Sequence, residues 1–249
     1  MPPAISVTVL CKNGERRIAE CLSRLASFEE VILLDTGSTD RTIEIASTFA
    51  NVKIFQDGFY GFGRMKNQAA GYAKNDWILN VDHDEILTEP LLAEIRGLDL
   101  DPRRIYAIKR ANHYNGKLVK CCGWHPDAVM RLYNRKSPGF SEKLVHESLK
   151  TDEMEGIIRL REPMKHFSFE DASDLLDKMQ RYARLYALEH KGRKKSSPFL
   201  AVFHGFFSFL KNYFLQRGFL YGYAGFLISV CNANGVFYKY IMLHEENSK

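Results

Sequence analysis

The sequence predicts an α/β fold in which strands and helices alternate and build a mostly parallel, doubly wound sheet with helices on both faces. Apolar runs of strand length recur at residues 5–10, 31–34, 52–55 and 77–81, and segments of helical character separate them. The runs end in polar loops rather than in two-residue hairpin turns. Successive parallel strands need such crossover connections, which are right-handed in nearly all proteins.

Each element follows from its own residues. The first run, Ile5–Leu10, is mostly apolar and β-branched, as expected for a strand covered on both faces. A helical stripe that contains Ile18, Cys21, Leu22 and Leu25 comes next. Residues 31–34 and 52–55 are the second and third strands. A helix from about residue 64 then leads to the fourth strand, and a helix capped near residue 88 follows it.

Composition limits the class of protein. The chain has 249 residues, enough for one α/β domain and an appendage, and a modest net charge of +5. Its five cysteines form an odd set without metal-site spacing, which favours a reducing compartment over a disulfide framework. The N-terminus enters a strand directly and leaves no room for a signal peptide, so we expect the catalytic part to face the cytoplasm.

Acidic residues follow three of the four predicted strands. They are Glu15, Asp35 and the pair Asp82 and Asp84. Ligands of open α/β sheets bind at the carboxyl ends of the strands, where these side chains gather. The chain has neither a GxGxxG motif after its first strand nor a P-loop. We therefore expect a nucleotide whose base and ribose are held by carboxylates and whose diphosphate is held by a cation, with Lys66 near the phosphates.

The acidic cluster that ends the fourth strand is the centre of this hypothesis. Asp82 and Asp84 are separated by one residue, so their carboxylates can reach the same side of the strand end and hold a divalent cation. Hard oxygen ligands favour Mg²⁺ or Mn²⁺. The alternative is an acidic surface turn in which Glu85 simply favours the start of the next helix.

With these motifs, the chain resembles a family 2 glycosyltransferase of the GT-A fold, and the resemblance covers nearly its whole length. Motifs downstream of the sheet are similar to those of lipopolysaccharide-core β-glucosyltransferases that add glucose to heptose. The motifs that carry the resemblance are Asn13 with Glu15, Asp35-Thr36-Gly37-Ser38-Thr39-Asp40, Lys66-Asn67, Asp82-His83-Asp84-Glu85, Trp124-His125-Pro126-Asp127, Arg131-Leu132-Tyr133, Val145-His146-Glu147 and Lys165-His166-Phe167-Ser168.

The resemblance assigns roles to these residues. It implies that Asp35 contacts uracil, that Asp82 lies at the ribose, and that Asp84 holds the cation that bridges the phosphates. It implies that His166 is a further metal ligand or phosphate contact. The other nucleotide-sugar-binding residues that it implies are Asn13, Glu15, Ser38, Lys66 and Asn67. His83 departs from the family pattern, because relatives often have a small residue there.

An inverting transfer needs a base that takes the proton of the acceptor hydroxyl. Glu147 is our candidate, because its apolar-flanked position can raise the pKa of its carboxylate. An ordinary ion-pair role for Glu147 is the alternative, and Glu142 is the nearest competitor. His146 can orient this carboxylate or contact the acceptor, or it can be a satisfied core histidine.

Two further residues are candidate contacts of the acceptor or of phosphate. Trp124 can offer a stacking face to a sugar ring, although a core anchor would have the same sequence. Arg131 can pair with a phosphate through its bidentate fork.

The last third of the chain has a different composition. No acidic residue lies between Glu189 and Glu245, whereas seven Lys and Arg residues and many aromatic residues do. This pattern is typical of a helix in the headgroup layer of an anionic membrane. Residues 218–238 are uncharged, but glycines and asparagines make them a poor membrane span, so we expect an interfacial hairpin or a dimer-forming helical pair. The aromatic residues are not interleaved with arginines, which argues against nucleic acid.

We therefore predict a GT-A catalytic domain at 1–168 and a helical region at 169–249 for membrane association or dimerisation. The predicted protein is a peripheral enzyme of the inner membrane face that moves glucose from UDP-glucose onto the heptose of a lipid-linked oligosaccharide, with Mg²⁺ or Mn²⁺. A different UDP-sugar transferase and a non-catalytic nucleotide-sugar-binding scaffold are the alternatives. A nucleotidyltransferase is disfavoured, because Lys12-Asn13-Gly14-Glu15 is not a glycine-rich basic loop.

Overall fold

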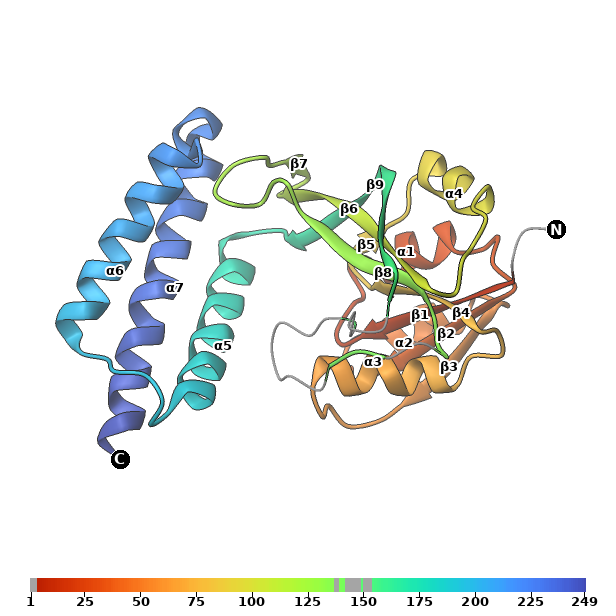
Figure 1. Cartoon of the computed structure of the whole chain (residues 1–249), viewed down its shortest axis with the longest axis horizontal. Helices are drawn as coiled ribbons and strands as arrows, with labels where there is room; N and C mark the ends of the chain where they lie inside the picture. The colour runs from red at the N-terminus through yellow and green to blue at the C-terminus, as the bar shows by residue number, and fades with distance from the viewer. Residues whose placement is uncertain (1–3, 137–138, 142–148, 150–153) are drawn as a thin grey trace. The chain divides into compact units, whose positions relative to one another are not determined.

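The computed structural model describes residues 4–136, 139–141, 149 and 154–249 (Figure 1). The chain divides into two compact units. The first contains Met1–Ala111 and Asp127–His166, and the second contains Asn112–Pro126 and Phe167–Lys249. The segment Asn112–Pro126 therefore groups with the C-terminal helices, which the two-segment prediction of 1–168 and 169–249 did not contain.

Nine strands of the described residues form one mixed sheet, in the order β3-β2-β1-β4-β8-β6-β9-β5 with β7 beside β6. The first four in this order are parallel, as predicted, and β8 then pairs antiparallel with β4 and β6. The strand bounds are β1 (Ile5–Cys11), β2 (Glu30–Asp35), β3 (Val52–Gln56), β4 (Trp77–Asp82), β5 (Glu85–Ile86), β6 (Arg104–Tyr114), β7 (Lys117–Leu118), β8 (Ala128–Asn134) and β9 (Gly156–Phe169).

Helices cover both faces of the parallel part, with α1 and α4 above it and α3 below it in Figure 1. Every residue of β1 and β2 is buried, as expected for central parallel strands. Each fully buried Val, Leu or Ile stabilises the fold by about 1.5–3 kcal/mol. The helix bounds are α1 (Ile18–Arg24), α2 (Thr42–Ala46), α3 (Phe62–Gly71) and α4 (Glu89–Arg96). The α/β fold class with helices on both faces is confirmed.

Local capping agrees with the sequence. The Thr88 hydroxyl accepts a hydrogen bond from the N–H of Leu91 at 3.3 Å, and a proline lies in the first turn of α4. The helix after the sheet lies in the predicted helical region and has Asp171 as its N-cap residue.

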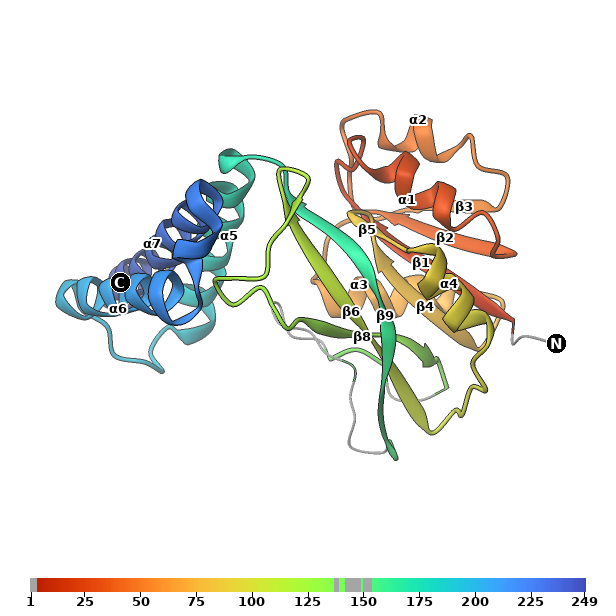
Figure 2. The same cartoon turned by 90° about the horizontal axis from the view of Figure 1, so that it is seen from above.

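The second unit contains three helices that pack side by side. They are α5 (Ala172–His190), α6 (Pro198–Leu210) and α7 (Gly222–Ser248), with short helical turns at Lys211–Leu215 and Gly218–Tyr221 between the last two. Helix α7 packs against both α5 and α6 (Figure 2). Among the residues that the structure describes, the segment Gly218–Ser248 is long and apolar enough to be a candidate membrane span, and one third of its most apolar part is buried.

All five cysteines are free and buried. Burial raises the pKa of the Cys121 thiol to about 12 and the pKa of Cys11 still further. These thiols therefore stay protonated at neutral pH and are poor nucleophiles.

Candidate active site

The carboxyl ends of three adjacent parallel strands form the candidate site. In the sheet register, Cys11 lies beside Asp35, and Leu10 lies beside Asp82. The loops after β1, β2 and β4 therefore leave the sheet from the same edge, where an open α/β sheet binds its ligands. The predicted strand-end acids are brought together at this edge.

Hydrogen bonds join the loops after β1 and β2. The Asn13 N–H donates to Ser38 Oγ at 2.8 Å, and Asn13 Oδ1 accepts from the Thr39 N–H at 2.8 Å. Glu15 Oε2 accepts from the Arg41 N–H at 3.1 Å. Asn13, Glu15 and Ser38 thus fix the shape of these loops, and their predicted contacts with a nucleotide sugar stay predictions.

Asp35 is fully buried and closes its own turn. Its Oδ2 accepts hydrogen bonds from the N–H groups of Gly37 at 3.1 Å and Ser38 at 3.0 Å, and its Oδ1 accepts from the Ser38 hydroxyl. Gly37 has a φ of 96°, a conformation that glycine adopts without strain. The uracil contact that the resemblance implies for Asp35 stays a prediction.

A buried network of charges lies beneath the end of β4. Arg131 on β8 is 3% exposed, and its Nη2 bonds to the carboxylates of both Asp82 and Glu85. Its Nη1 donates to Asn80 Oδ1 at 3.0 Å. Lys66 on α3 is also 3% exposed, and its Nζ lies 3.5 Å from Asp82 Oδ1. Two cationic side chains, of Arg131 and Lys66, therefore pair with the carboxylate of Asp82.

This network fixes the charge of Asp82. Burial alone would raise the pKa of Asp82, but the charges of Arg131 and Lys66 outweigh it and hold that pKa well below its usual range. The carboxylate of Asp82 is therefore ionised at any physiological pH. It can accept hydrogen bonds from hydroxyl groups, and it cannot act as an acid.

Glu85 is the member of the network that the sequence analysis missed. It has no exposed surface, and its Oε2 accepts from the Asp82 N–H at 3.0 Å. Arg110 on β6 lies 3.6 Å from its Oε1 and also pairs with Asp127 at 2.9 Å. Glu85 therefore belongs to the support of the site and does not serve the start of α4.

Arg131 faces inward in the same way. The prediction had it contact a phosphate, whereas the structure directs its guanidinium to two carboxylates of the protein. An arginine between apolar neighbours on a strand was the available signal, since an inward-facing charge needs a buried partner. Its predicted phosphate contact stays a prediction.

The two candidate metal ligands lie close together. Strand β5 pairs antiparallel with β9, so that Glu85 is opposite His166. Asp84, which precedes Glu85, therefore lies near the same histidine. The distance from His166 Nε2 to Asp84 Oδ2 is 3.6 Å. Two ligands of one cation at about 2.1 Å each are about 3 to 4 Å apart, so the pair fits a shared ion. No cluster of three or more His, Cys, Asp or Glu suited to a metal occurs in the described part of the chain.

The side chain of Asn67 binds the backbone of Phe140. Its Nδ2 donates to the Phe140 carbonyl at 3.0 Å, and its Oδ1 accepts from the Phe140 N–H at 2.8 Å. Phe140 in turn forms an isolated antiparallel bridge with Leu149. Asn67 therefore anchors the chain just before the segment that contains the candidate base. Its predicted contact with the nucleotide sugar stays a prediction.

Three of the predicted residues cannot be placed beside this site. Glu147, its competitor Glu142 and His146 lie outside the described residues. Trp124 belongs to the second unit, where its ring stacks on Phe169 with 5.2 Å between the ring centroids. That environment agrees with a core anchor, and the sugar contact of Trp124 stays a prediction.

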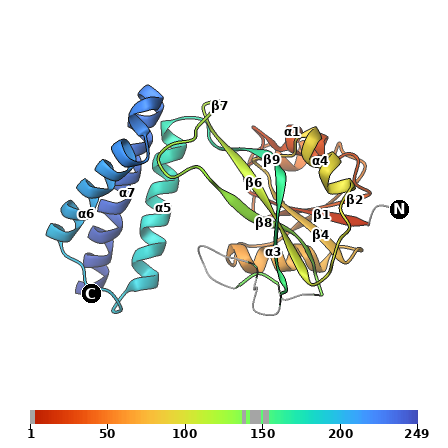
Figure 3. The same cartoon turned by 45° about the horizontal axis from the view of Figure 1, so that its top comes forward.

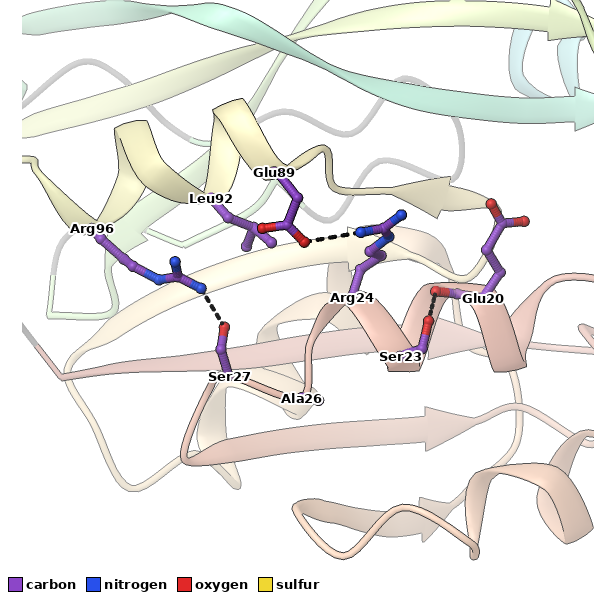
Figure 4. A pocket seen from close by; sticks show the side chains of 8 residues that line it. All are labelled: Glu20, Ser23, Arg24, Ala26, Ser27, Glu89, Leu92 and Arg96. Carbon is purple, nitrogen blue, oxygen red and sulfur yellow. Dashed lines mark hydrogen bonds and ion pairs between the residues drawn. The ribbon is translucent and has the colours of Figure 1, made fainter.

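A shallow pocket of about 340 Å³ lies elsewhere on the first unit, between α1 and α4 (Figure 4). Two of its charged groups, Arg24 and Glu89, pair with each other at 2.9 Å. Its lining contains no residue of the loops that follow β1, β2 and β4, so we do not regard it as the active site. The lining residues are Glu20, Ser23, Arg24, Ala26, Ser27, Glu89, Leu92 and Arg96.

Comparison with known proteins defines the class. Residues 6–120 match the family described as Glycosyl transferase family 2. A glycosyltransferase of Rickettsia typhi is 30% identical over 258 residues, which cover 98% of this chain and 88% of that protein. The fold, the strand-end acids and these matches define a glycosyltransferase with a GT-A fold.

More specifically, the chain belongs to glycosyltransferase family 2. A solved structure with a similar fold is the mannosyltransferase PcManGT from Pyrobaculum calidifontis, in complex with GDP-Man and Mn²⁺. It has a TM-score of 0.51 and 14% identity, and the match covers 94% of this chain and 74% of that one. The lipopolysaccharide core biosynthesis glycosyltransferase LpsC of Rhizobium meliloti is 25% identical over 91 residues, 35% of this chain and 34% of that protein.

Proposed function

We propose that this glycosyltransferase moves glucose from UDP-glucose to a heptose of the lipopolysaccharide or lipooligosaccharide inner core, with inversion at the anomeric carbon. The observation that carries the donor site is the 3.6 Å approach of Asp84 and His166 beside an ionised Asp82. The acceptor class rests on the resemblance of the downstream motifs and on the partial match to LpsC.

Asp84 and His166 would hold the cation, with the rest of its coordination shell left to phosphate oxygens and water. PcManGT, which shares the fold, was solved with Mn²⁺. When bound, a divalent cation supplies Lewis-acid stabilisation of the departing diphosphate. The donor oxygen of Asp84 and the ring nitrogen of His166 are the only protein groups that this proposal assigns to it.

The remaining residues of the site bind and orient the substrates in this proposal. Asp82, kept ionised by Arg131 and Lys66, accepts hydrogen bonds from the ribose hydroxyls. The joined loops that contain Asn13 and Asp35 hold the uridine. Further donor contacts come from Glu15, Ser38, Lys66 and Asn67.

Glu147 is the proposed base. Its carboxylate takes the proton of the acceptor hydroxyl, and the oxygen then attacks the anomeric carbon from the face opposite the diphosphate, which inverts the configuration. Asn67 holds Phe140, seven residues before Glu147 in the chain, through two hydrogen bonds. The proposed contacts of the acceptor or of phosphate are Trp124, Arg131 and His146.

The acceptor is lipid-linked in this proposal, and the second unit brings the enzyme to an anionic membrane from the cytoplasmic side. Its helices contain many exposed aromatic side chains and no acidic residue between Glu189 and Glu245. A homodimer through the same helices is the alternative use of this surface.

The donor is tested first, because its site does not depend on the acceptor. Calorimetric titration with UDP-glucose, UDP-N-acetylglucosamine, UDP-galactose and GDP-mannose is carried out with Mn²⁺, with Mg²⁺ and with EDTA. We expect UDP-glucose to bind best, and only with the cation. Preferential binding of GDP-mannose, or equal binding in EDTA, would contradict the proposed donor site.

The acceptor is tested by transfer to a deacylated inner-core oligosaccharide that ends in heptose, with NMR of the product to read the new anomeric configuration. Transfer to a different glycan only would favour another UDP-sugar transferase of this family. Donor binding without turnover on any glycan would favour the non-catalytic scaffold.

A further inference from the structure

Helix α6 presents its large apolar side chains to the outside of the second unit. Phe199 is 77% exposed and Phe206 is 58% exposed, whereas Ala201 and Gly205 are buried. A Cβ atom at Gly205 would lie 3.2 Å from the Cβ of Phe237, so this side of α6 packs directly on α7. A helix on a protein surface in water normally has the opposite arrangement.

The exposed side chains of α6 form a continuous stripe, which we call the α6 ridge. Its members recur at the i, i+3, i+4, i+7 and i+8 spacing of one helix face. They are Phe199, Val202, Phe203, Phe206 and Phe207. An exposed apolar stripe of this size on a single helix marks an interaction surface.

The turn after α6 extends the ridge. Phe214, Leu215, Phe219 and Leu220 are all about half exposed or more, with Leu215 at 81%. Helix α7 then returns beside α6 (Figure 3). The apolar surface therefore includes the tip of the helical hairpin.

Cationic side chains lie at both ends of the α6 ridge. Arg193 and Lys195 are exposed in the connection before α6, and Lys211 and Arg217 are exposed in the turn after it. The sequence has no acidic residue between Glu189 and Glu245, and Glu246 at the end of α7 pairs with Lys191 at 3.2 Å. An anionic bilayer complements this arrangement, because its headgroups are negatively charged and the acyl chains beneath them are apolar.

The opposite side of the unit has a different character. Helix α5 exposes Asp177, Gln180, Arg181 and Arg184, which are polar or charged. A helical unit in a bilayer interior would need apolar side chains on every side. The exposed surface of α5 is therefore mixed, because Leu176 and Leu188 lie among these polar and charged side chains, whereas the exposed residues of α6 are all apolar.

Two polar residues in the middle of α7 bond to neighbours within the unit. Asn232 donates to Asn212 Oδ1 at 2.8 Å, and the Ser229 hydroxyl donates to the Gly225 carbonyl at 2.6 Å. Helix α6 has 13 residues, or about 20 Å, which is shorter than the ~30 Å hydrocarbon core. These features fit a hairpin that lies in the interface, with α7 as its inner support.

We propose that the α6 ridge and the turn after it insert into the headgroup layer of an anionic membrane, and that α7 does not cross the bilayer. The proposal deepens the membrane association given under the proposed function and rests on it for biological context. Its evidence is independent of the sugar donor and acceptor.

Sedimentation with lipid vesicles tests the proposal on the full-length protein. The double variant F199Q/F206Q removes two rings of the α6 ridge. L176Q/L188Q is the control, because Leu176 and Leu188 are also exposed apolar residues, at 47% and 53%, but lie on α5. We expect wild type and control to sediment with phosphatidylglycerol vesicles, and F199Q/F206Q to partition at least about tenfold less. Binding should weaken with added salt and on pure phosphatidylcholine.

Depth of insertion is read with F206W and L188W, in vesicles that contain brominated lipid. Additional fluorescence quenching over wild type for F206W, and none for L188W, is expected. Equal quenching of the two would contradict insertion through α6.

The other occupants of the ridge give distinguishable results. Wild type that does not sediment overturns the proposal. If it is then a dimer in light scattering and F199Q/F206Q is a monomer, the ridge joins two copies of the chain. If it is a monomer, a soluble partner becomes the better hypothesis. Vesicle binding by wild type without UDP-glucose binding would leave this inference standing and contradict the proposed donor.

Discussion

In strands β1 and β2 of the first unit the large apolar side chains are buried, whereas in α6 of the second unit most of them are exposed. Strands β1 and β2 bury every residue, and at the strand ends Asp35 of β2 accepts hydrogen bonds from its own turn while Asp82 of β4 pairs with Arg131. In α6, by contrast, Ala201 and Gly205 face the neighbouring helix and phenylalanines face out. The first pattern is typical of a domain that is surrounded by water. The second is typical of a helix that contacts an apolar surface. The fraction of apolar residues therefore does not distinguish the two environments. The residues that are buried do, because large side chains are buried in β1 and β2 and small ones in α6.

The largest effect that separates the two units is expected from removing the charge of one candidate metal ligand in the first unit. Asp84→Asn should lower transfer by at least about 1000-fold, because it removes an anionic cation ligand. It should also abolish the cation dependence of UDP binding, measured by calorimetry, and leave vesicle sedimentation unchanged. Asp99→Asn, at an exposed acid, is the control and should keep full activity. Undiminished turnover in Asp84→Asn would exclude this residue as a metal ligand.

Glu85→Gln tests whether the buried network supports the first unit. It leaves Arg131 and Arg110 with one carboxylate fewer in a buried place, which should lower the free energy of unfolding by about 3 kcal/mol. Urea denaturation measures this change. Glu44→Gln breaks an exposed pair with Arg41 and should have no measurable effect. Equal midpoints for the two variants would show that the network does not stabilise the fold.

Much of the first unit could be predicted from its sequence, because the information is local. Four apolar runs, the polar loops after them and the Thr88 cap each lie within a few residues. The approach of Asp84 and His166 was anticipated only through the family resemblance. The physical reason for it is the antiparallel pairing of β5 with β9, and no local pattern specifies that pairing.

The buried role of Glu85 could not be predicted for the same reason. An acidic residue before a helix has an adequate local explanation, the favourable interaction with the helix N-terminus. Its actual partner Arg131 is 46 residues away. The outward orientation of the phenylalanines of α6, by contrast, has a local signal in the sequence. Ala201 and Gly205 are separated by one helical turn, which predicts a close helix–helix contact on that side and leaves the phenylalanines outside.

Gly205→Leu tests the packing of the second unit. The Cβ position is already 3.2 Å from Phe237, so the added side chain should force α6 away from α7 and destabilise the unit by about 2 kcal/mol. Val202→Leu is the control, because residue 202 is 61% exposed, and it should be neutral. Thermal unfolding followed by circular dichroism measures both. A neutral Gly205→Leu would mean that the two helices do not pack closely.

The smallest expected effect concerns Glu30, which starts β2 on the side of the sheet away from the site. Burial alone would raise the pKa of Glu30, but hydrogen bonds from Lys53 at 2.8 Å, from the Lys74 N–H at 2.8 Å and from Ser6 at 2.6 Å outweigh it and lower that pKa below 4.5. A carboxylate whose pKa is lower in the folded state contributes stability that is fully present above its unfolded pKa. That stability is lost as the pH falls through the folded value.

Glu30→Gln should therefore lower the free energy of unfolding by about 1 to 2 kcal/mol at pH 7. The difference in unfolding free energy between the variant and wild type should shrink steadily below about pH 4.5. Protonation of Glu30 removes the stabilisation by its charge from wild type at low pH, whereas the variant lacks that stabilisation at every pH. Urea denaturation at pH 7, 5, 4 and 3.5 gives the difference directly. General acid destabilisation cancels between the two proteins, so a difference that stays constant with pH would show that the charge of Glu30 does not stabilise the fold.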